Sequence, residues 1–319
     1  MVAYIARRLL LIPITLILIT MIVFLVERMV PGNVIDLLES ELAATTGGEI
    51  DRAAIEHILG LDEPIYIQYG KWIGDIVVHA DFGTTLRNGQ PVIDDITHRI
   101  PVTVELSLIA LLIGLIISIP LGTYSAIRQD TFSDYAGRTI AILAISVPIF
   151  WTATLIMIYP SIWWGWSPPM EIISFTKNPL GNLGVFIIPA LVMGTSMTGA
   201  TMRMMRTMML EVVRQDYMRT AYAKGLSERT VIMKHGIKNA LIPVITIVGL
   251  QIPHLIGGSV IIEQIFNLPG MGRLLLSAIS QREYNTISAI TVLLSVFVLV
   301  CNLFVDLLYG WLDPRIKYE

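Results

Sequence analysis

Long uncharged apolar runs alternate with charged segments along the chain, and this pattern predicts membrane-spanning helices. A helix needs about 20 apolar residues to cross the hydrocarbon core of a bilayer. Such runs predict six spans, at residues 9–26, 106–127, 139–159, 183–202, 239–262 and 287–309. The first run is longer than a typical signal-peptide core, and no small-x-small cleavage site follows it. We therefore expect it to remain as the first span.

Charges are segregated between the connections, and this predicts the orientation of the spans. Residues 27–99 hold thirteen acids and five bases. The two terminal tips and the connections after the second and fourth spans together hold fourteen bases and seven acids. Basic residues mark the cytoplasmic side of a membrane protein. We therefore expect both termini in the cytoplasm and residues 31–100 outside.

The predicted fold class is an all-α membrane protein with a helical external segment after the first span. Its expected parts are an N-terminal tip with the first span, the external segment and a five-span core, at residues 1–30, 31–100 and 101–319. Within the external segment we expect helices and then a loop, at residues 34–42, 51–59, 64–78 and 81–91. The third helix carries Tyr and Trp at helical spacing, which predicts a position on the bilayer surface or against the bundle.

Composition narrows the chemistry that this chain can perform. Charged residues make up 15% and apolar residues 54%, whereas soluble domains average about 25% charged residues. The single cysteine, Cys301, allows no disulfide within the chain and no cysteine metal cluster. A methionine-rich stretch at residues 193–209 predicts soft apolar packing rather than copper ligation. We expect no bound metal, no nucleic-acid partner and, without a nucleophile elbow or paired carboxylates, no catalytic site.

The connection after the fourth span, at about residues 206–238, is longer than a link between two helices requires. Residues 203–238 hold eight bases and three acids, which places them in the cytoplasm. We expect a helix over residues 201–224, with Gly225 in a left-handed position after its end. Ser227 then caps a short helix over residues 228–235, whose end is loosened by Gly236.

A short helix of this kind is stable mainly through packing on something else. The segment therefore predicts a docking surface for a soluble partner. The alternative is a solvated basic loop that attracts anionic lipid headgroups.

Polar residues in the fifth span are candidates for contacts inside the membrane. His254 is the titratable residue deepest within a span, and Gln251 lies on the same helical face. Gly257 and Gly258 follow and give room for close packing or for a substrate. An intramembrane histidine indicates either a transport pathway or a helix-packing hydrogen bond. Glu263, at the external end of this span, is expected to be an interfacial charge.

The basic connection resembles the "EAA" loop of ABC importer permeases, in particular of the dipeptide, oligopeptide and nickel transport family. The resemblance lies in Ala221, Gly225 and the return to the membrane at residues 239–243 (NALIP). Arg219 stands where the general motif has Glu, and Lys238 where it has its final Pro; both departures are usual in this branch. Further matching stretches lie at residues 4–36, 60–72, 81–101 and 263–274, so the resemblance covers nearly the whole chain.

The resemblance implies the first of two permease subunits of a binding-protein-dependent importer in a prokaryotic cytoplasmic membrane. Its expected partners are a homologous second permease, two cytoplasmic ATPases and an external binding protein. This sequence has no P-loop of the form GxxxxGK[ST], so ATP and Mg²⁺ are expected in the partner ATPases. The residues implied in coupling to an ATPase are Ala221, Lys224, Gly225, Leu226, Ser227, Glu228 and His235.

Di- or oligopeptides are the expected cargo, and nickel chelates or oligosaccharides are the alternatives within the same machinery. A different class, the secondary transporters, normally carries acidic residues inside its spans for ion coupling. The second to fifth predicted spans contain none. A third hypothesis is that the chain is a membrane scaffold or receptor that recruits a cytoplasmic protein and transports nothing.

Overall fold

The computed structural model describes residues 2–29, 62–85, 87–169 and 171–312, and these residues are predominantly helical. The external helices expected at residues 34–42 and 51–59 lie outside the described residues. Contacts divide the chain into two compact units. Unit 1 consists mainly of Val102–Gly272 with Val300–Glu319, and unit 2 of Val2–Pro101 with Arg273–Leu299.

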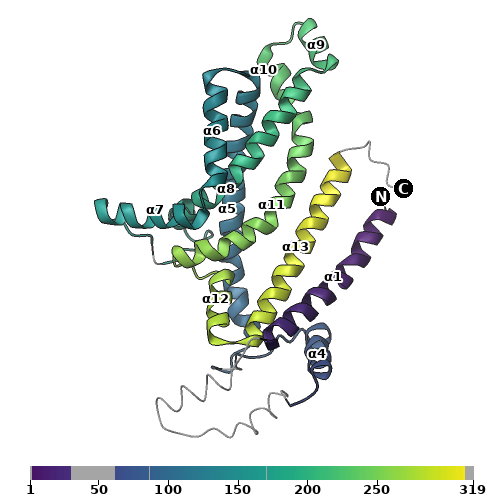
Figure 1. Cartoon of the computed structure of the whole chain (residues 1–319), viewed down its shortest axis with the longest axis vertical. Helices are drawn as coiled ribbons and strands as arrows, with labels where there is room; N and C mark the ends of the chain where they lie inside the picture. Colours follow the sequence, from purple (N-terminus) through teal and green to yellow (C-terminus); the bar gives the residue numbers. More distant parts are fainter. Residues whose placement is uncertain (1, 30–61, 86, 170, 313–319) are drawn as a thin grey trace. The chain divides into compact units, whose positions relative to one another are not determined.

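The described residues contain six candidate spans if a bent helix pair counts as one, which agrees with the expected number. Five single stretches are long and apolar enough to cross a membrane. They contain α1 (Val2–Met29), α5 (Val92–Ile127), α8 (Pro179–Val213), α11 (Lys238–Ile265) and α13 (Tyr284–Leu312), drawn in Figure 1. The sixth is the pair α6 (Phe132–Ser146) and α7 (Ile149–Trp164).

The third span is broken, so the expectation of one continuous helix over residues 139–159 was wrong. The axes of α6 and α7 differ by 93°, and Figure 1 shows α7 leaving the side of the α6–α8 pair. A proline disfavours the helical conformation in the residue before it. Val147, before Pro148, is accordingly extended, with φ −84° and ψ 122°.

Helix α5 begins at Val92, well before the apolar run that predicted it. Its 36 residues give a length of about 54 Å at 1.5 Å per residue. It therefore continues beyond a hydrocarbon core of about 30 Å. The helix passes the expected external boundary at residues 100 and 101 without interruption, because charged residues end an apolar run without ending a helix.

The core of unit 1 lies between α5, α7, α8 and α11. Helix α8 packs closely against both α6 and α11. A methyl group added to Gly194 of α8 would lie 2.6 Å from the carbonyl oxygen of Ala110 in α5, so the two backbones meet at this glycine. Small residues permit such close approach in membrane proteins. Five methionines of the methionine-rich stretch have buried side chains, which confirms apolar packing: Met193 and Met197 in this core, Met205 and Met209 in a second cluster, and Met202.

In unit 2, helix α4 (Ile65–Gly74) packs against α1 and continues as the π-helix η1 (Asp75–His79). Tyr69 and Trp72 form an aromatic cluster with Phe24. The hydroxyl groups of Thr20 and Tyr69 lie 3.0 Å apart. The helix expected at residues 64–78 is therefore present, and its aromatic side chains hold it against the first span. Helix α12 (Met271–Gln281) follows α11 along the chain.

Candidate functional site

The connection between α8 and α11, residues 214–238, is compact, and it is called the docking segment after the role that the sequence predicts for it. Helix α8 ends at Val213, and α9 (Asp216–Ala223) starts after an extended Gln215 with φ −74° and ψ 149°. The continuous helix expected over residues 201–224 was therefore wrong. No proline or glycine marks this break, and Asp216 in the first turn of α9 is its one local signal, since acids favour helix N-termini.

The turn after α9 is the one that the sequence predicts. Gly225 has φ +77°, and its N–H donates to the carbonyl oxygen of Tyr222 over 2.9 Å. A glycine adopts this left-handed conformation without the steric cost that a Cβ imposes. Ser227 precedes α10 (Glu228–Thr230), but its hydroxyl lies 2.8 Å from the Thr230 hydroxyl and caps no backbone N–H. The position of the helix start was correct, and its capping interaction was not.

The short helix does not end at Gly236, so a separate helix over residues 228–235 was also a wrong expectation. Helix α10 continues as the π-helix η2 (Val231–Ile237) and then directly as α11. Gly236 is buried against α8 and α9. A Cβ at this position would lie 3.2 Å from the terminal methyl of Met209 and 3.6 Å from that of Met218. The glycine therefore serves close packing here, not helix termination.

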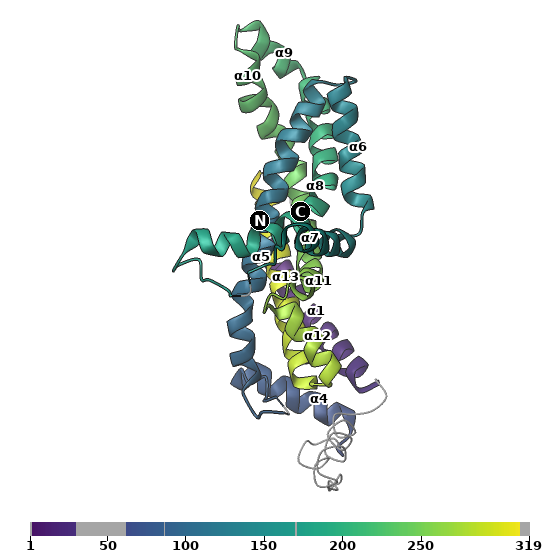
Figure 2. The same ribbon diagram turned by 90° about the vertical axis from the view of Figure 1, so that its left-hand side faces the viewer.

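A small apolar core supports an exposed surface in the docking segment. Met218, Ala221 and Val231 are buried together, whereas every residue from 224 to 230 is exposed. Of the predicted coupling residues, Ala221 is thus internal and His235 is half-buried. The others lie on one exposed stretch: Lys224, Gly225, Leu226, Ser227 and Glu228. Figure 2 shows α9 and α10 at the end of unit 1 where α8 ends.

The sequence analysis named Leu226 but missed the other exposed apolar residues of this surface. Met233 is 59% exposed and Leu226 is 40% exposed. Tyr217 and Tyr222 are also exposed, between cationic side chains. Large apolar side chains within a basic, water-facing stretch were the available signal. An apolar patch with a polar rim is typical of a protein-interaction site.

One face of α11 is exposed and mixes apolar with polar groups. Its residues follow a 4-3-4-3 spacing and so share a helical face: Leu250, His254, Gly257, Ile261 and Gln264. A Cβ on Gly257 or Gly258 would meet no atom within 4 Å. Gln251 lies elsewhere, because its Nε2 donates to the buried Thr201 hydroxyl of α8 over 3.1 Å. The structure therefore separates Gln251 from His254 and Gly257.

Glu263 is fully buried, so the expectation of an interfacial charge was wrong. The hydroxyl of Thr103 donates to its Oε1 over 2.6 Å, and the N–H of Met271 donates to that hydroxyl over 2.8 Å. A Cβ on Gly270 would overlap the carboxylate of Glu263. The turn after α11 thus wraps around this side chain, an arrangement that no sequence spacing indicates.

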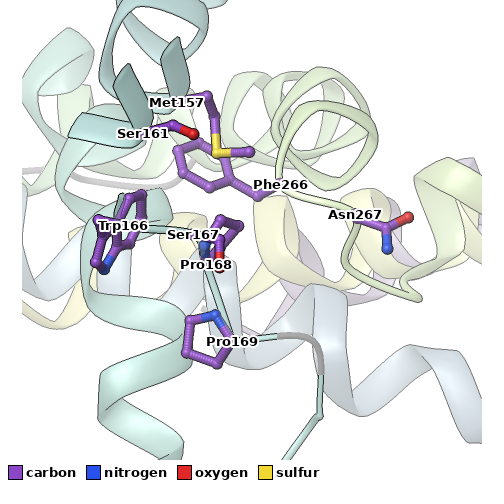
Figure 3. Close-up of a pocket in the computed structure, with 8 residues that line it drawn as sticks. All are labelled: Met157, Ser161, Trp166, Ser167, Pro168, Pro169, Phe266 and Asn267. Atoms are coloured by element: carbon purple, nitrogen blue, oxygen red, sulfur yellow. The ribbon is translucent and has the colours of Figure 1, made fainter. Parts of the chain in front are cut away.

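A cavity of about 250 Å³ lies where the end of α7 and the end of α11 meet. Figure 3 shows Phe266 and Met157 side by side, with Trp166 and Pro168 below them. The Asn267 side chain points away from this group. The lining is mainly apolar, without the convergent polar groups that usually orient a ligand.

The structure defines a multi-span helical membrane protein with a packed docking segment between two spans. The chain belongs to the family described as "Binding-protein-dependent transport system inner membrane component", whose profile matches residues 118–318. The N-terminal profile of the same systems matches residues 1–107. This confirms the prediction of an ABC importer permease in a prokaryotic cytoplasmic membrane. The orientation of the termini stays a prediction.

The chain is similar to several curated permeases over its full length. It is 41% identical to the oligopeptide transport system permease protein AppB of Bacillus subtilis (strain 168), with 100% of each chain covered. It is 39% identical to the dipeptide transport system permease protein DppB of Alkalihalophilus pseudofirmus, again with 100% of each covered. Identity to the glutathione transport system permease protein GsiC of Salmonella paratyphi A is 35%, also over 100% of each.

The fold also resembles a solved transporter. A chain of the MetNI methionine ABC transporter, crystallised in inward-facing conformations, matches with a TM-score of 0.54 at 13% identity. The match covers 68% of this chain and 96% of the other. At this identity the likeness supports the all-α permease fold alone.

Proposed function

We propose that this chain is one of two permease subunits of an importer that carries peptides into the cell, driven by ATP hydrolysed in partner chains. The relatives AppB and DppB are named for oligopeptide and dipeptide transport, which supports peptides over nickel chelates or oligosaccharides. The observation that carries the proposal is the docking segment, with exposed Leu226 and Met233 on a buried core.

In this proposal, the docking segment binds a groove of a cytoplasmic ATPase. Leu226 and Met233 supply the apolar contact, and Lys224, Ser227 and Glu228 form its polar rim. Ala221 fixes the shape of the segment from below by packing against Met218 and Val231. His235 stands at the base, where its carbonyl oxygen accepts a hydrogen bond from Asn239 Nδ2 over 2.7 Å. ATP binding then favours one conformation by stabilising it more than the other.

The exposed face of α11 is proposed to line the substrate pathway, which a homologous second permease completes. A polar side chain inside a membrane span generally faces the bundle interior or a water-filled cavity. His254 offers a hydrogen-bonding group on this face, while Gly257 and Gly258 leave room beside it. Gln251 would hold α11 in place beside the pathway through its hydrogen bond to α8. An external binding protein would deliver the cargo.

The ATPase partnership is tested with the intact chain purified from its native membrane and placed in proteoliposomes. We expect ATP hydrolysis to accompany the unmodified chain and to be lost with Leu226→Asp. Phe132→Asp is the matched control, since Phe132 is 89% exposed at the start of α6, where an acid suits the helix N-terminus. Hydrolysis that persists in Leu226→Asp would contradict the docking role.

The cargo is tested by uptake into ATP-loaded proteoliposomes supplied with the binding protein. Radiolabelled trialanine is compared with a nickel–histidine chelate and with an oligosaccharide. Uptake of the peptide alone is expected, and it should depend on ATP. Uptake of the chelate or the oligosaccharide without peptide uptake would replace the proposed cargo and leave the ATPase partnership intact.

A further inference from the structure

A buried ion pair joins α6 to α8 close to the docking segment. Asp134 of α6 is 0% exposed. Arg206 of α8 donates from Nε to its Oδ1 and from Nη2 to its Oδ2, each over 2.7 Å. This two-pronged geometry fixes the angle between carboxylate and guanidinium as well as their distance.

The same carboxylate also holds α5 and the turn between α5 and α6. The buried Ser125 hydroxyl, near the end of α5, donates to Oδ1. The backbone N–H of Asp130, in the turn, donates to Oδ2 over 3.1 Å. Arg138 lies further out, with Nη1 3.9 Å from Oδ2. One side chain therefore ties together the ends of three helices.

Helix α8 connects this cluster to the docking segment. Met209, one turn after Arg206, is fully buried, and its terminal methyl lies against Gly236 of η2. On the other side, a Cβ on Gly122 of α5 would lie 2.8 Å from the Cβ of Met205. The part of α8 that carries Arg206 is thus closely packed against both η2 and α5.

Burial of an ion pair does not by itself make a protein more stable, because well-packed apolar residues of the same size stabilise a core equally well. The pair adds a fixed relative orientation of α6 and α8. Apolar surfaces slide past one another with little loss of contact, whereas a bidentate pair holds one rotation and one register of α8 against α6. The cluster therefore restrains the relative motion of these helices.

We propose that Asp134 and Arg206 are positioning residues of the transport cycle. We call the Asp134–Arg206 pair the joint. The joint makes α5, α6 and α8 move together with the docking segment when the ATPases close. Without it, the ATPases move the docking segment while the spans respond only in part. This inference rests on the proposed function, since it requires an ATPase bound to the docking segment.

The test uses the full importer in proteoliposomes and measures peptide transported per ATP hydrolysed. Asp134→Asn keeps the shape of the side chain and removes its charge. We expect the ratio to fall about tenfold, within the usual range of coupling free energies, while hydrolysis continues. Arg206→Lys keeps the charge and loses the two-pronged contact, so an intermediate ratio is expected. Arg203→Gln, an exposed change one turn earlier on α8, should leave the ratio unchanged.

A second readout does not depend on the cargo. Spin labels are placed on the exposed residues Gln129 and Thr207, in a chain whose single cysteine is changed by Cys301→Ser. In the otherwise unmodified chain, the label distance should stay constant when a non-hydrolysable ATP analogue is added. In Asp134→Asn it should shift and its distribution should broaden.

The possible outcomes separate the joint from the proposed function. If the unmodified complex shows no Leu226-dependent hydrolysis, the proposed function fails and the joint fails with it. If hydrolysis depends on Leu226 but Asp134→Asn keeps the normal ratio and label distance, the joint alone is overturned. If the importer with Asp134→Asn does not assemble, Ser125→Ala is used instead, because it removes only one neutral hydrogen bond to Asp134. A lowered ratio of peptide transported to ATP hydrolysed then supports the joint, and an unchanged ratio overturns it.

Discussion

Unit 1 holds two buried carboxylates, one near each end of the part of α5 that belongs to this unit, and their contacts differ. Asp134 meets a guanidinium, a hydroxyl and a backbone N–H. Glu263 meets the Thr103 hydroxyl and two glycines that leave space for it. The contact residues Ser125 and Thr103 are 22 positions apart on α5, or about 33 Å along the helix. Asp134 thus accepts hydrogen bonds from a cation, whereas the Thr103 hydroxyl supplies a neutral hydrogen bond to Glu263.

The comparison teaches where rigidity is concentrated. At the docking end, charge pairing locks three helices in one register. At the other end, Glu263 contacts the Thr103 hydroxyl, and two glycines of the following turn approach its carboxylate closely. Removal of the Arg206 guanidinium from Asp134 should accordingly cost more than removal of the neutral Thr103 hydroxyl from Glu263.

Arg206→Met should give the largest loss of stability. Methionine fills much of the space of the side chain but removes the bidentate cation of Asp134, which keeps the longer contact with Arg138 at 3.9 Å. Breaking a buried pair costs about 3–5 kcal/mol. Equilibrium unfolding of the purified chain in mixed micelles measures the free energy. Arg203→Met, on an exposed position of α8, should change it by less than about 0.5 kcal/mol. Equal effects for the two changes would show that Asp134 does not depend on Arg206.

Thr103→Val should cost less, about 1–3 kcal/mol, because it removes a neutral partner from two buried groups. The valine is nearly isosteric, so the loss reflects the bonds to Glu263 Oε1 and from Met271 N–H. The same unfolding measurement applies, with Thr139→Val on the exposed side of α6 as control. A loss larger than that of Arg206→Met would reverse the comparison between the two carboxylates.

Much of this fold could be predicted from sequence because membrane spans are long and their signal is strong. The number of spans and the packing of the methionines followed from apolar runs alone. The break at Pro148 did not, since a proline in a membrane helix is compatible with either a kink or a sharp turn. Which occurs depends on the neighbouring helices, and sequence periodicity does not specify them.

In the docking segment, too, some features could be predicted from the sequence and others could not. The left-handed turn at Gly225 is a local conformational requirement and was predicted correctly. The roles of Gly236 and of the break before Asp216 depend on which side chains pack against them, here Met209 and Met218. The Asp134–Arg206 pair joins residues 72 positions apart. A single sequence carries no signal for such a contact, so it had no place in the prediction.

Gly225→Ala should cost about 1 kcal/mol, because a Cβ is disfavoured at a φ of +77°. The position is open, with no atom within 4 Å of an added Cβ, so backbone conformation alone causes the loss. Gly184→Ala is the matched control. Gly184 is equally open but lies inside α8, where alanine is favoured by about 1 kcal/mol. Unfolding measurements should therefore show opposite signs, and a loss at both positions would rule out the conformational explanation.

Met233→Asp should have the smallest effect on stability and a large effect on partner binding. The side chain is 59% exposed at the start of η2, next to the buried Val231 and Ile232. An exposed substitution changes stability by less than about 0.5 kcal/mol, so the micelle unfolding curve should match that of the unmodified chain. A charged group in an apolar contact should lower the affinity for the ATPase at least about tenfold.

Binding of the ATPase to the reconstituted permease measures this affinity, and Met233→Leu should preserve it because an apolar side chain of similar size remains. Together with Arg206→Met, this variant separates the two kinds of residue at the docking end: the buried pair controls the free energy of unfolding, and the exposed methionine controls association. Normal ATPase affinity in Met233→Asp would show that Met233 lies outside the docking contact and that the contact is limited to the turn with Leu226. Reduced stability with normal affinity would instead assign Met233 to the fold.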